Sequence, residues 1–155
     1  MDANTERGRA AIEDLRAGLA SIGDPYIETP QDRPSDIDGF FLDRGSRFIV
    51  AAFEGKARYG ITYRDFMTRY GGEWLVTHDK LLRGAAVARS LCIPFYGIVY
   101  LVESRVTMAV KIANRRGEIV ARLRVEETVT KATCNGGEAK RVNAFVDMKE
   151  AKIWR

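Results

Sequence analysis

The chain is 155 residues long and 46% hydrophobic, which suits one domain, and we expect a single unit over residues 1–155. Short apolar runs exclude a membrane span, a polar first segment excludes a secretory signal, and two cysteines without metal-ligand spacing favour a cytoplasmic protein with reduced thiols. Net charge is +4, but residues from Arg105 onward hold 12 Lys and Arg against 6 Asp and Glu, so they carry +6 and the first 104 carry −2.

The first predicted element is a helix that Asn4 or Thr5 caps and that runs to about Ala20. Gly23 and Pro25 then end it, because neither residue continues a helix well. Its apolar residues fall on one face, which predicts that the helix packs on a sheet: Ala11, Ile12, Leu15, Leu19 and Ile22.

A hairpin is predicted next. Residues 28–35 form a polar connection rich in Pro and Asp, and residues 37–42 read as a strand. Gly45-Ser46 is a natural turn, and the apolar run over residues 48–53 is the returning strand. The two strands therefore pair and bring the segments that flank them together.

Acidic and basic side chains gather at one end of this hairpin. Glu54 and Lys56 are two residues apart on the returning strand, so their side chains point to the same face. Strand pairing carries Asp38 to that end; Asp36 shares its parity and is a second candidate ligand, and we favour Asp38. The backbone carbonyl of Gly55 faces the same edge. The bland alternative for Glu54 and Lys56 is an exposed ion pair worth roughly 0–1 kcal/mol.

This donor set indicates a hard divalent cation, Mg²⁺ with Mn²⁺ as a substitute, because such ions prefer oxygen ligands and retain several waters. Asp38 and Glu54 are expected to hold the ion, with Gly55 as a backbone ligand. The ion acts as a Lewis acid and activates water, while Lys56 orients that water or stabilises charge on a phosphate. That is the chemistry of phosphodiester hydrolysis.

Residues 58–74 mix cations with aromatic rings and include a short helix predicted from Thr62. Such side chains pair with phosphates and stack on bases. The equally weighted alternative is a lid helix that buries its aromatic rings and leaves its arginines in solvent. The candidate nucleic-acid contacts, including three outside this segment, are Arg58, Tyr59, Arg64, Arg69, Lys80, Arg115 and Arg116.

The second half of the chain begins with a helix over residues 80–91, started by Thr77 or Asp79. The continuous apolar run over residues 95–102 predicts a strand buried on both faces. Alternating segments at 106–112 and 119–125, around a turn at 114–117, predict a hairpin appended to the sheet. Asn135-Gly136-Gly137 predicts a further turn, followed by a last strand or helix that ends at Trp154.

Three features together resemble the PD-(D/E)XK nuclease superfamily, over about residues 4–103. They are the aspartate segment Pro34-Ser35-Asp36-Ile37-Asp38-Gly39-Phe40-Phe41, the triplet Glu54-Gly55-Lys56, and the helix over 80–91 with its following buried strand. The resemblance, closest to small phage and prokaryotic members, implies an α/β fold: a restriction-endonuclease-like mixed β-sheet core flanked by helices. Residues 104–155 would be an appended basic β-hairpin extension.

The resemblance also implies a function, that of a Mg²⁺-dependent DNA endonuclease, structure-selective in some members and often a homodimer. Glu13 matches the acidic residue that many members bring from the first helix; its alternative is an ordinary solvent-facing residue. Members often carry a glutamine at the opening of the second helix, where this chain has Lys80, or His78 just before it. The alternative function is a catalytically inactive nuclease-fold protein that binds DNA or serves as a structural phage component.

Overall fold

The computed structural model describes residues 5–130 and 139–155. Within these ranges the helices are α1 (Glu6–Ile22), α2 (Tyr63–Thr68) and α3 (His78–Leu91). The strands are β1 (Tyr26–Glu28), β2 (Gly39–Leu42), β3 (Ile49–Arg58), β4 (Glu73–Thr77), β5 (Phe95–Leu101), β6 (Val106–Ala113), β7 (Leu123–Thr130), β8 (Ala139–Asp147) and β9 (Lys152–Trp154).

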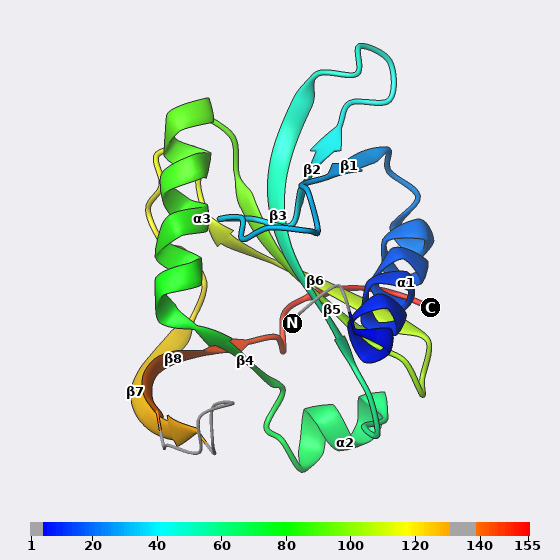
Figure 1. The fold of residues 1–155 in the computed structure, drawn as a ribbon, viewed down its shortest axis with the longest axis vertical. Coiled ribbons are helices and arrows are strands. Elements are labelled where there is room, and N and C mark those ends of the chain that lie inside the picture. Colours follow the sequence, from blue (N-terminus) through cyan, green and yellow to red (C-terminus); the bar gives the residue numbers. More distant parts are fainter. Residues whose placement is uncertain (1–4, 131–138) are drawn as a thin grey trace.

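The larger sheet has six strands in the order β1-β2-β3-β5-β6-β9. Within this sheet β3 and β5 run parallel, whereas the other neighbouring strands pair antiparallel, so the sheet is mixed. The expectation of an α/β protein with a mixed sheet and flanking helices is confirmed. Figure 1 shows α1 and α3 on opposite sides of the sheet, which leaves the paired ends of β2 and β3 between them.

Helices cover both faces of β5, and the sequence of that strand reflects this. On the α1 side a small core of buried residues includes Leu19, Phe53 and Ile98. On the α3 side a larger core includes Leu81 and Phe95, both with no exposed surface. Because neither face of β5 meets solvent, its run of apolar residues is continuous rather than alternating. The prediction of a strand buried on both faces is confirmed.

A second, three-stranded sheet has the order β4-β8-β7. This arrangement corrects the predicted hairpin, because the strand after the turn at 114–117 does not pair with β6 beyond one bridge, Ala113 to Ile119. The chain turns away after that bridge, and β7 pairs over its whole length with β8. Alternation in the sequence correctly predicted a strand there, four to five residues too early, but it carries no information on which strand is the partner.

Local signals placed several boundaries correctly. The side chain of Thr5 caps α1 by accepting a hydrogen bond from the backbone N–H of Gly8, and Gly23 ends it in a left-handed conformation. Thr62 caps α2 in the same way through Asp65. The strand predicted over 37–42 begins only at Gly39, and the short strands β1 and β4 were not predicted. The predicted turn at 135–137 lies outside the described residues.

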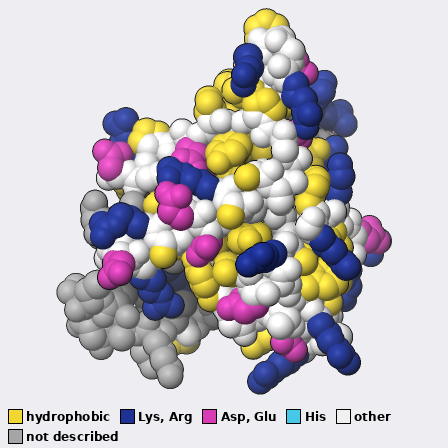
Figure 2. Space-filling view, turned by 90° about the vertical axis from the view of Figure 1, so that its right-hand side faces the viewer, with side chains coloured by type: hydrophobic (Ala, Val, Ile, Leu, Met, Phe, Trp, Pro, Cys, Tyr) yellow, Lys and Arg dark blue, Asp and Glu magenta, His cyan; other side chains and the backbone are white. Residues whose placement is uncertain are grey.

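The β2–β3 hairpin projects beyond the helices at the top of Figure 1. Its turn is organised by Asp43, whose carboxylate accepts hydrogen bonds from the backbone N–H groups of Gly45 and Ser46. The hydrophobic residues that follow are left in solvent, with Phe48 76% exposed. Figure 2 shows hydrophobic side chains at this tip with Lys or Arg side chains close by. The tip therefore adds nothing to the core.

The helices of the described part of the chain include none that is long and apolar enough to cross a membrane.

The two sheets pack closely together at Gly97. A Cβ added to Gly97, on β5, would lie 2.3 Å from the ring of Trp74, which is 1% exposed on β4. Gly97→Ala is therefore expected to lower the free energy of unfolding by about 1–3 kcal/mol, the usual cost of overpacking. Gly45→Ala is the matched control, because an added Cβ there has its nearest contact at 3.5 Å. Equal stability of the two variants in urea denaturation would contradict this packing.

Candidate active site

The site lies where β2 stops pairing with β3. The last paired residues are Gly39 and Phe53, after which β3 continues to Arg58 with β5 as its strand partner on the other side. The edge of β3 from Glu54 onward is thus open. The side chain of Asp38 pairs with the start of this open edge: its Oδ2 accepts a hydrogen bond of 2.8 Å from the backbone N–H of Gly55. The N–H and carbonyl of one strand residue point to the same neighbour, so the Gly55 carbonyl faces this edge as well.

Two carboxylates and one ammonium meet at this edge. Lys80 Nζ lies 2.6 Å from Glu54 Oε1 and 3.5 Å from Asp38 Oδ1. Three elements supply these side chains: Asp38 immediately precedes β2, Glu54 lies in β3, and Lys80 lies in the first turn of α3. The predicted pairing of Asp38 with Glu54 across the hairpin is therefore present in the structure, with Lys80 as a contact that the hairpin alone does not supply.

Glu54 is a buried acid whose surroundings disfavour its ionised form. It is 6% exposed, and its Oε2 is buried without a hydrogen-bond partner among the described residues. Burial, followed by the neighbouring charge of Asp38, raises the pKa of Glu54 to about 8, although Lys80 acts in the opposite direction. A buried acceptor with no donor costs free energy. Such an arrangement is typical of functional sites, where a ligand supplies the missing partner.

Lys56 and Arg58 continue the face of Glu54 along β3, because alternate residues of a strand share a face. Lys56 is exposed, and it makes no ion pair with another described residue. Partial desolvation of its ammonium by the cleft walls, followed by repulsion from Arg58, lowers the pKa of Lys56. Arg58 is half-buried, with a buried Nε that has no partner within the described ranges, and burial lowers its pKa. Two cations that form no ion pair with the described acidic residues thus follow the acidic pair.

A cleft of about 520 Å³ opens on this edge. Asp38, Glu54, Lys56 and Lys80 all line it, and α1 contributes one wall. The helix approaches closely because residue 55 is glycine: an added Cβ would lie 2.7 Å from the side chain of Leu15. The cleft is therefore a polar edge of β3 held between α1 and α3.

Two of the predicted acidic ligands lie elsewhere. Asp36 is exposed and pairs with Arg83 at 3.3 Å, outside the strand whose parity it was expected to share, because that strand begins only at Gly39. Glu13 is exposed and pairs with Arg16 on the same helix, and it does not line the cleft. The structure thus brings Asp38 to Glu54 and leaves Asp36 and Glu13 apart from them.

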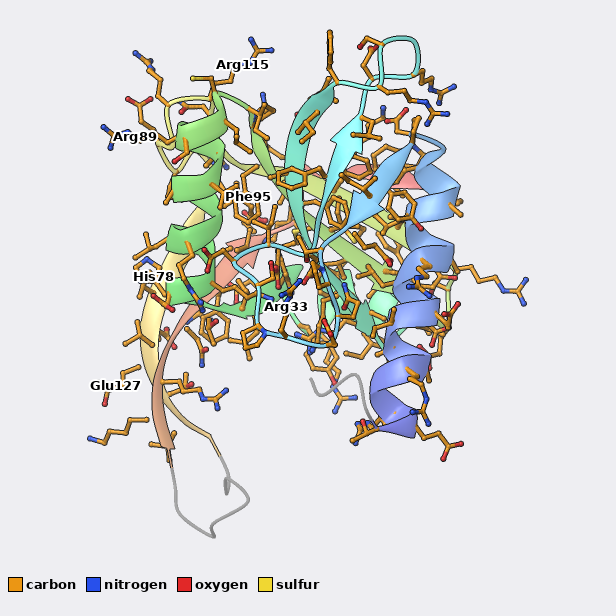
Figure 3. All side chains as sticks on the ribbon, turned by 45° about the horizontal axis from the view of Figure 1, so that its top comes forward. Arg33, His78, Arg89, Phe95, Arg115 and Glu127 are labelled. Atoms are coloured by element: carbon orange, nitrogen blue, oxygen red, sulfur yellow. The ribbon has the colours of Figure 1, made fainter. Side chains whose placement is uncertain are left out.

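The predicted nucleic-acid contacts are distributed unevenly. Lys80 is in the site, Arg58 is one strand repeat beyond Lys56, and the hydroxyl of Tyr59 donates a hydrogen bond to Asp14. Arg64 and Arg69 are exposed on and just after α2. The helix buries Phe66 but leaves Tyr70 47% exposed, so the predicted burial of its aromatic rings is present only in part. Arg115 and Arg116 are exposed in the turn after β6. Figure 3 places Arg115 near Arg89, at the end of α3 that is remote from His78.

Sequence patterns missed part of the cleft wall. Glu28, at the end of β1, lines the cleft and accepts hydrogen bonds from the Arg16 guanidinium. Arg33 lines it from the loop between β1 and β2, and Figure 3 shows that loop between α1 and α3. A carboxylate that ends a short strand and a Pro-rich loop carry no periodic signal, so these residues emerge only from the tertiary structure.

The donor set fits a magnesium ion. Asp38 and Glu54 offer hard carboxylate oxygens. The buried Oε2 of Glu54 has no hydrogen-bond donor among the described residues, and a bound cation would compensate for this unfavourable burial. Within residues 5–130 and 139–155 there is no cluster of three or more His, Cys, Asp or Glu side chains arranged for a metal. Magnesium is often held by one or two carboxylates together with waters and substrate phosphate, so a pair is sufficient.

The raised pKa of Glu54 predicts how stability depends on pH in metal-free protein. Between pH 4.5 and about 8 the folded state binds more protons than the unfolded state, so the free energy of unfolding falls as pH rises through this window. Glu54→Gln removes that titration. We expect the difference between the two melting temperatures, wild type minus Glu54→Gln, to fall by about 5 °C or more between pH 5 and pH 8 when both are measured in EDTA. Parallel curves would contradict the burial of an ionisable Glu54.

No protein-family model, curated protein or solved structure matches this chain.

Proposed function

We propose that the protein is a divalent-metal-dependent DNA endonuclease of the PD-(D/E)XK type, which hydrolyses a phosphodiester bond with Mg²⁺ as cofactor. The observation that carries the proposal is the geometry at the open edge of β3. Asp38 and Glu54 converge on one ammonium, a buried oxygen of Glu54 lacks a partner, and Lys56 stands beside them in the same cleft. This is a cation site with a separate cationic group next to it.

The arrangement of elements supports a restriction-endonuclease-like fold. A mixed sheet carries the acidic pair on an antiparallel hairpin, and the next strand in the sheet, β5, runs parallel to β3 after the helix α3. One helix packs on each face beside the hairpin. Arg115 and Arg116 are exposed in the turn after β6, at positions open to a polyanion or a second copy of the chain.

Each residue has a role that follows from its position. Asp38 and Glu54 bind the cation, and the hydrogen bond from Gly55 fixes the orientation of the Asp38 carboxylate. When bound, Mg²⁺ polarises the phosphate and lowers the pKa of water. Lys56 reaches the cleft without a carboxylate partner among the described residues, so its charge is free to stabilise negative charge that develops on the phosphate. The half-buried Arg58 extends the cationic face toward the next phosphate.

The test is a panel of end-labelled DNAs, comprising duplex, single strand, flap and four-way junction, incubated with protein in Mg²⁺, Mn²⁺ or EDTA. Cleavage with either metal and none in EDTA is the expected result, and the preferred DNA identifies the substrate. A gel-shift assay on the same DNAs is run in parallel. Binding without cleavage in any metal would refute the enzyme and leave a nuclease-fold DNA-binding protein.

A further inference from the structure

Lys80 occupies the oxygens that a metal ion needs. Its ammonium contacts Glu54 Oε1 at 2.6 Å and Asp38 Oδ1 at 3.5 Å. The remaining Asp38 oxygen, Oδ2, already accepts the Gly55 N–H. The Asp38 oxygen that remains for a cation is therefore Oδ1, which Lys80 contacts. The Lys80 ammonium thus lies between the two candidate ligands, Asp38 and Glu54.

The electrostatics show how strongly this contact is held. Burial by itself disfavours the charged form of Lys80, yet the attraction of Asp38 and Glu54 outweighs it and raises the pKa of Lys80 above its ordinary value. The Lys80 side chain is 28% exposed and that of Glu54 is 7% exposed, so solvent screens the pair only in part. Without Lys80, the two carboxylates would lie side by side with no ion-pair partner among the described residues.

We propose that Lys80 is an internal counter-cation that holds the metal position in the metal-free protein, and that a divalent ion binds by displacing it. The inference rests on the proposed function, because it assumes that Asp38 and Glu54 are the metal ligands. The reason is competition: an ammonium and a divalent cation repel each other, and Lys80 contacts the Asp38 oxygen that Gly55 leaves open together with one of the two Glu54 oxygens. Lys80 thereby neutralises Asp38 and Glu54 in the metal-free protein. Because a metal ion must displace it, Lys80 also raises the metal concentration at which the site is filled.

Lys56 provides the matched comparison. Both lysines line the cleft and carry the same charge, but Lys56 forms no ion pair with Asp38 or Glu54. A loss of general positive potential affects metal binding in both Lys→Met variants, whereas relief of direct competition affects only Lys80→Met. Lys80→Arg keeps the charge and the competition.

The experiment is calorimetric titration of Mg²⁺ and Mn²⁺ into EDTA-stripped protein in the absence of DNA. Lys80→Met is expected to bind each metal about tenfold more tightly than Lys56→Met, the magnitude that a partly buried ion pair represents. Lys80→Arg is expected to stay near the wild type. Equal or weaker metal binding by a folded Lys80→Met variant would overturn the proposal.

A second measurement uses the wild-type chain, so it stands even if Lys80→Met fails to fold. Amine acetylation, read by mass spectrometry, reports whether Lys80 is engaged; its reactivity is expected to rise several-fold when Mn²⁺ is added. Lys140, exposed on β8, is the internal control and is expected to stay constant. Unchanged Lys80 reactivity under saturating metal would contradict displacement. If no variant binds metal, the proposed function itself fails; if all bind equally, only this inference fails.

Discussion

Replacing Glu54 with glutamine is expected to lower the rate of the proposed Mg²⁺-dependent DNA cleavage by about 10³-fold or more, the usual cost of removing a metal ligand from a hydrolase. Glutamine has nearly the same volume as glutamate but no negative charge, so the core is preserved while the cation loses its buried partner. Glu54 is 6% exposed, and the metal-binding role requires the charged form that burial disfavours. Single-turnover cleavage of the preferred DNA at saturating Mg²⁺ measures the effect.

The control for this prediction is Glu13→Gln. Glu13 is also a glutamate on α1, but it is exposed, pairs with Arg16 and does not line the cleft. Its substitution is expected to leave the cleavage rate within about twofold of the wild type, as is usual for surface positions. An equal loss of cleavage in both variants would contradict the assignment of Glu54. Thermal melts of both variants in the assay buffer exclude unfolding as the cause.

Replacing Lys56 with methionine is expected to lower the proposed cleavage by about 10²–10³-fold while Mg²⁺ binding persists, because one preorganised group that stabilises transition-state charge contributes that much. The structure separates the two lysines by their contacts: Lys80 touches the carboxylates, whereas Lys56 makes no ion pair within the described residues. Lys56 is therefore assigned to the phosphate. Cleavage rate and calorimetric metal affinity, measured on the same preparation, test this division.

Lys140→Met is the control for the loss of a positive charge from the protein as a whole. Lys140 is exposed on β8, away from the cleft, where it pairs with Glu127. Its substitution is expected to leave both quantities near their wild-type values at moderate salt. A Lys56→Met variant that cleaves normally, or that loses metal affinity in proportion to its rate, would show that Lys56 does not act on the phosphate.

The acidic pair was predictable because its geometry depends on short-range rules. A two-residue period places Glu54 and Lys56 on one face, and pairing of the hairpin strands brings Gly39 opposite Phe53. The register shift between Phe41 and Leu42 is a detail that the turn at Gly45-Ser46 does not encode. Asp38 then lies opposite Glu54. Asp36 has the same parity, yet the strand begins after it, and this boundary depends on the hydrogen bonds of Thr29 to the backbone of Ile37 and Asp38. Sequence parity does not encode those contacts.

The role of Lys80 depends on tertiary packing. The sequence placed it at the opening of a helix and assigned it to nucleic acid, but its contact with Glu54 arises because α3 packs across the face of β3. That packing is fixed by distant apolar contacts; for example, Gly84 leaves room for the ring of Phe95. The same limitation applied to β7, whose alternation was recognised while its partner β8, distant in the sequence, was not. Non-local pairing is the part that periodicity leaves open.

The most direct test of the account is nicking of supercoiled plasmid DNA by wild-type protein and by the double variant Asp38→Asn/Glu54→Gln, purified side by side. Each protein is assayed in Mg²⁺ and in EDTA. The account predicts that the wild type nicks the plasmid in Mg²⁺ only and that the folded double variant does not nick it under either condition. Equal nicking by both proteins in Mg²⁺, or undiminished wild-type nicking in EDTA, would contradict it.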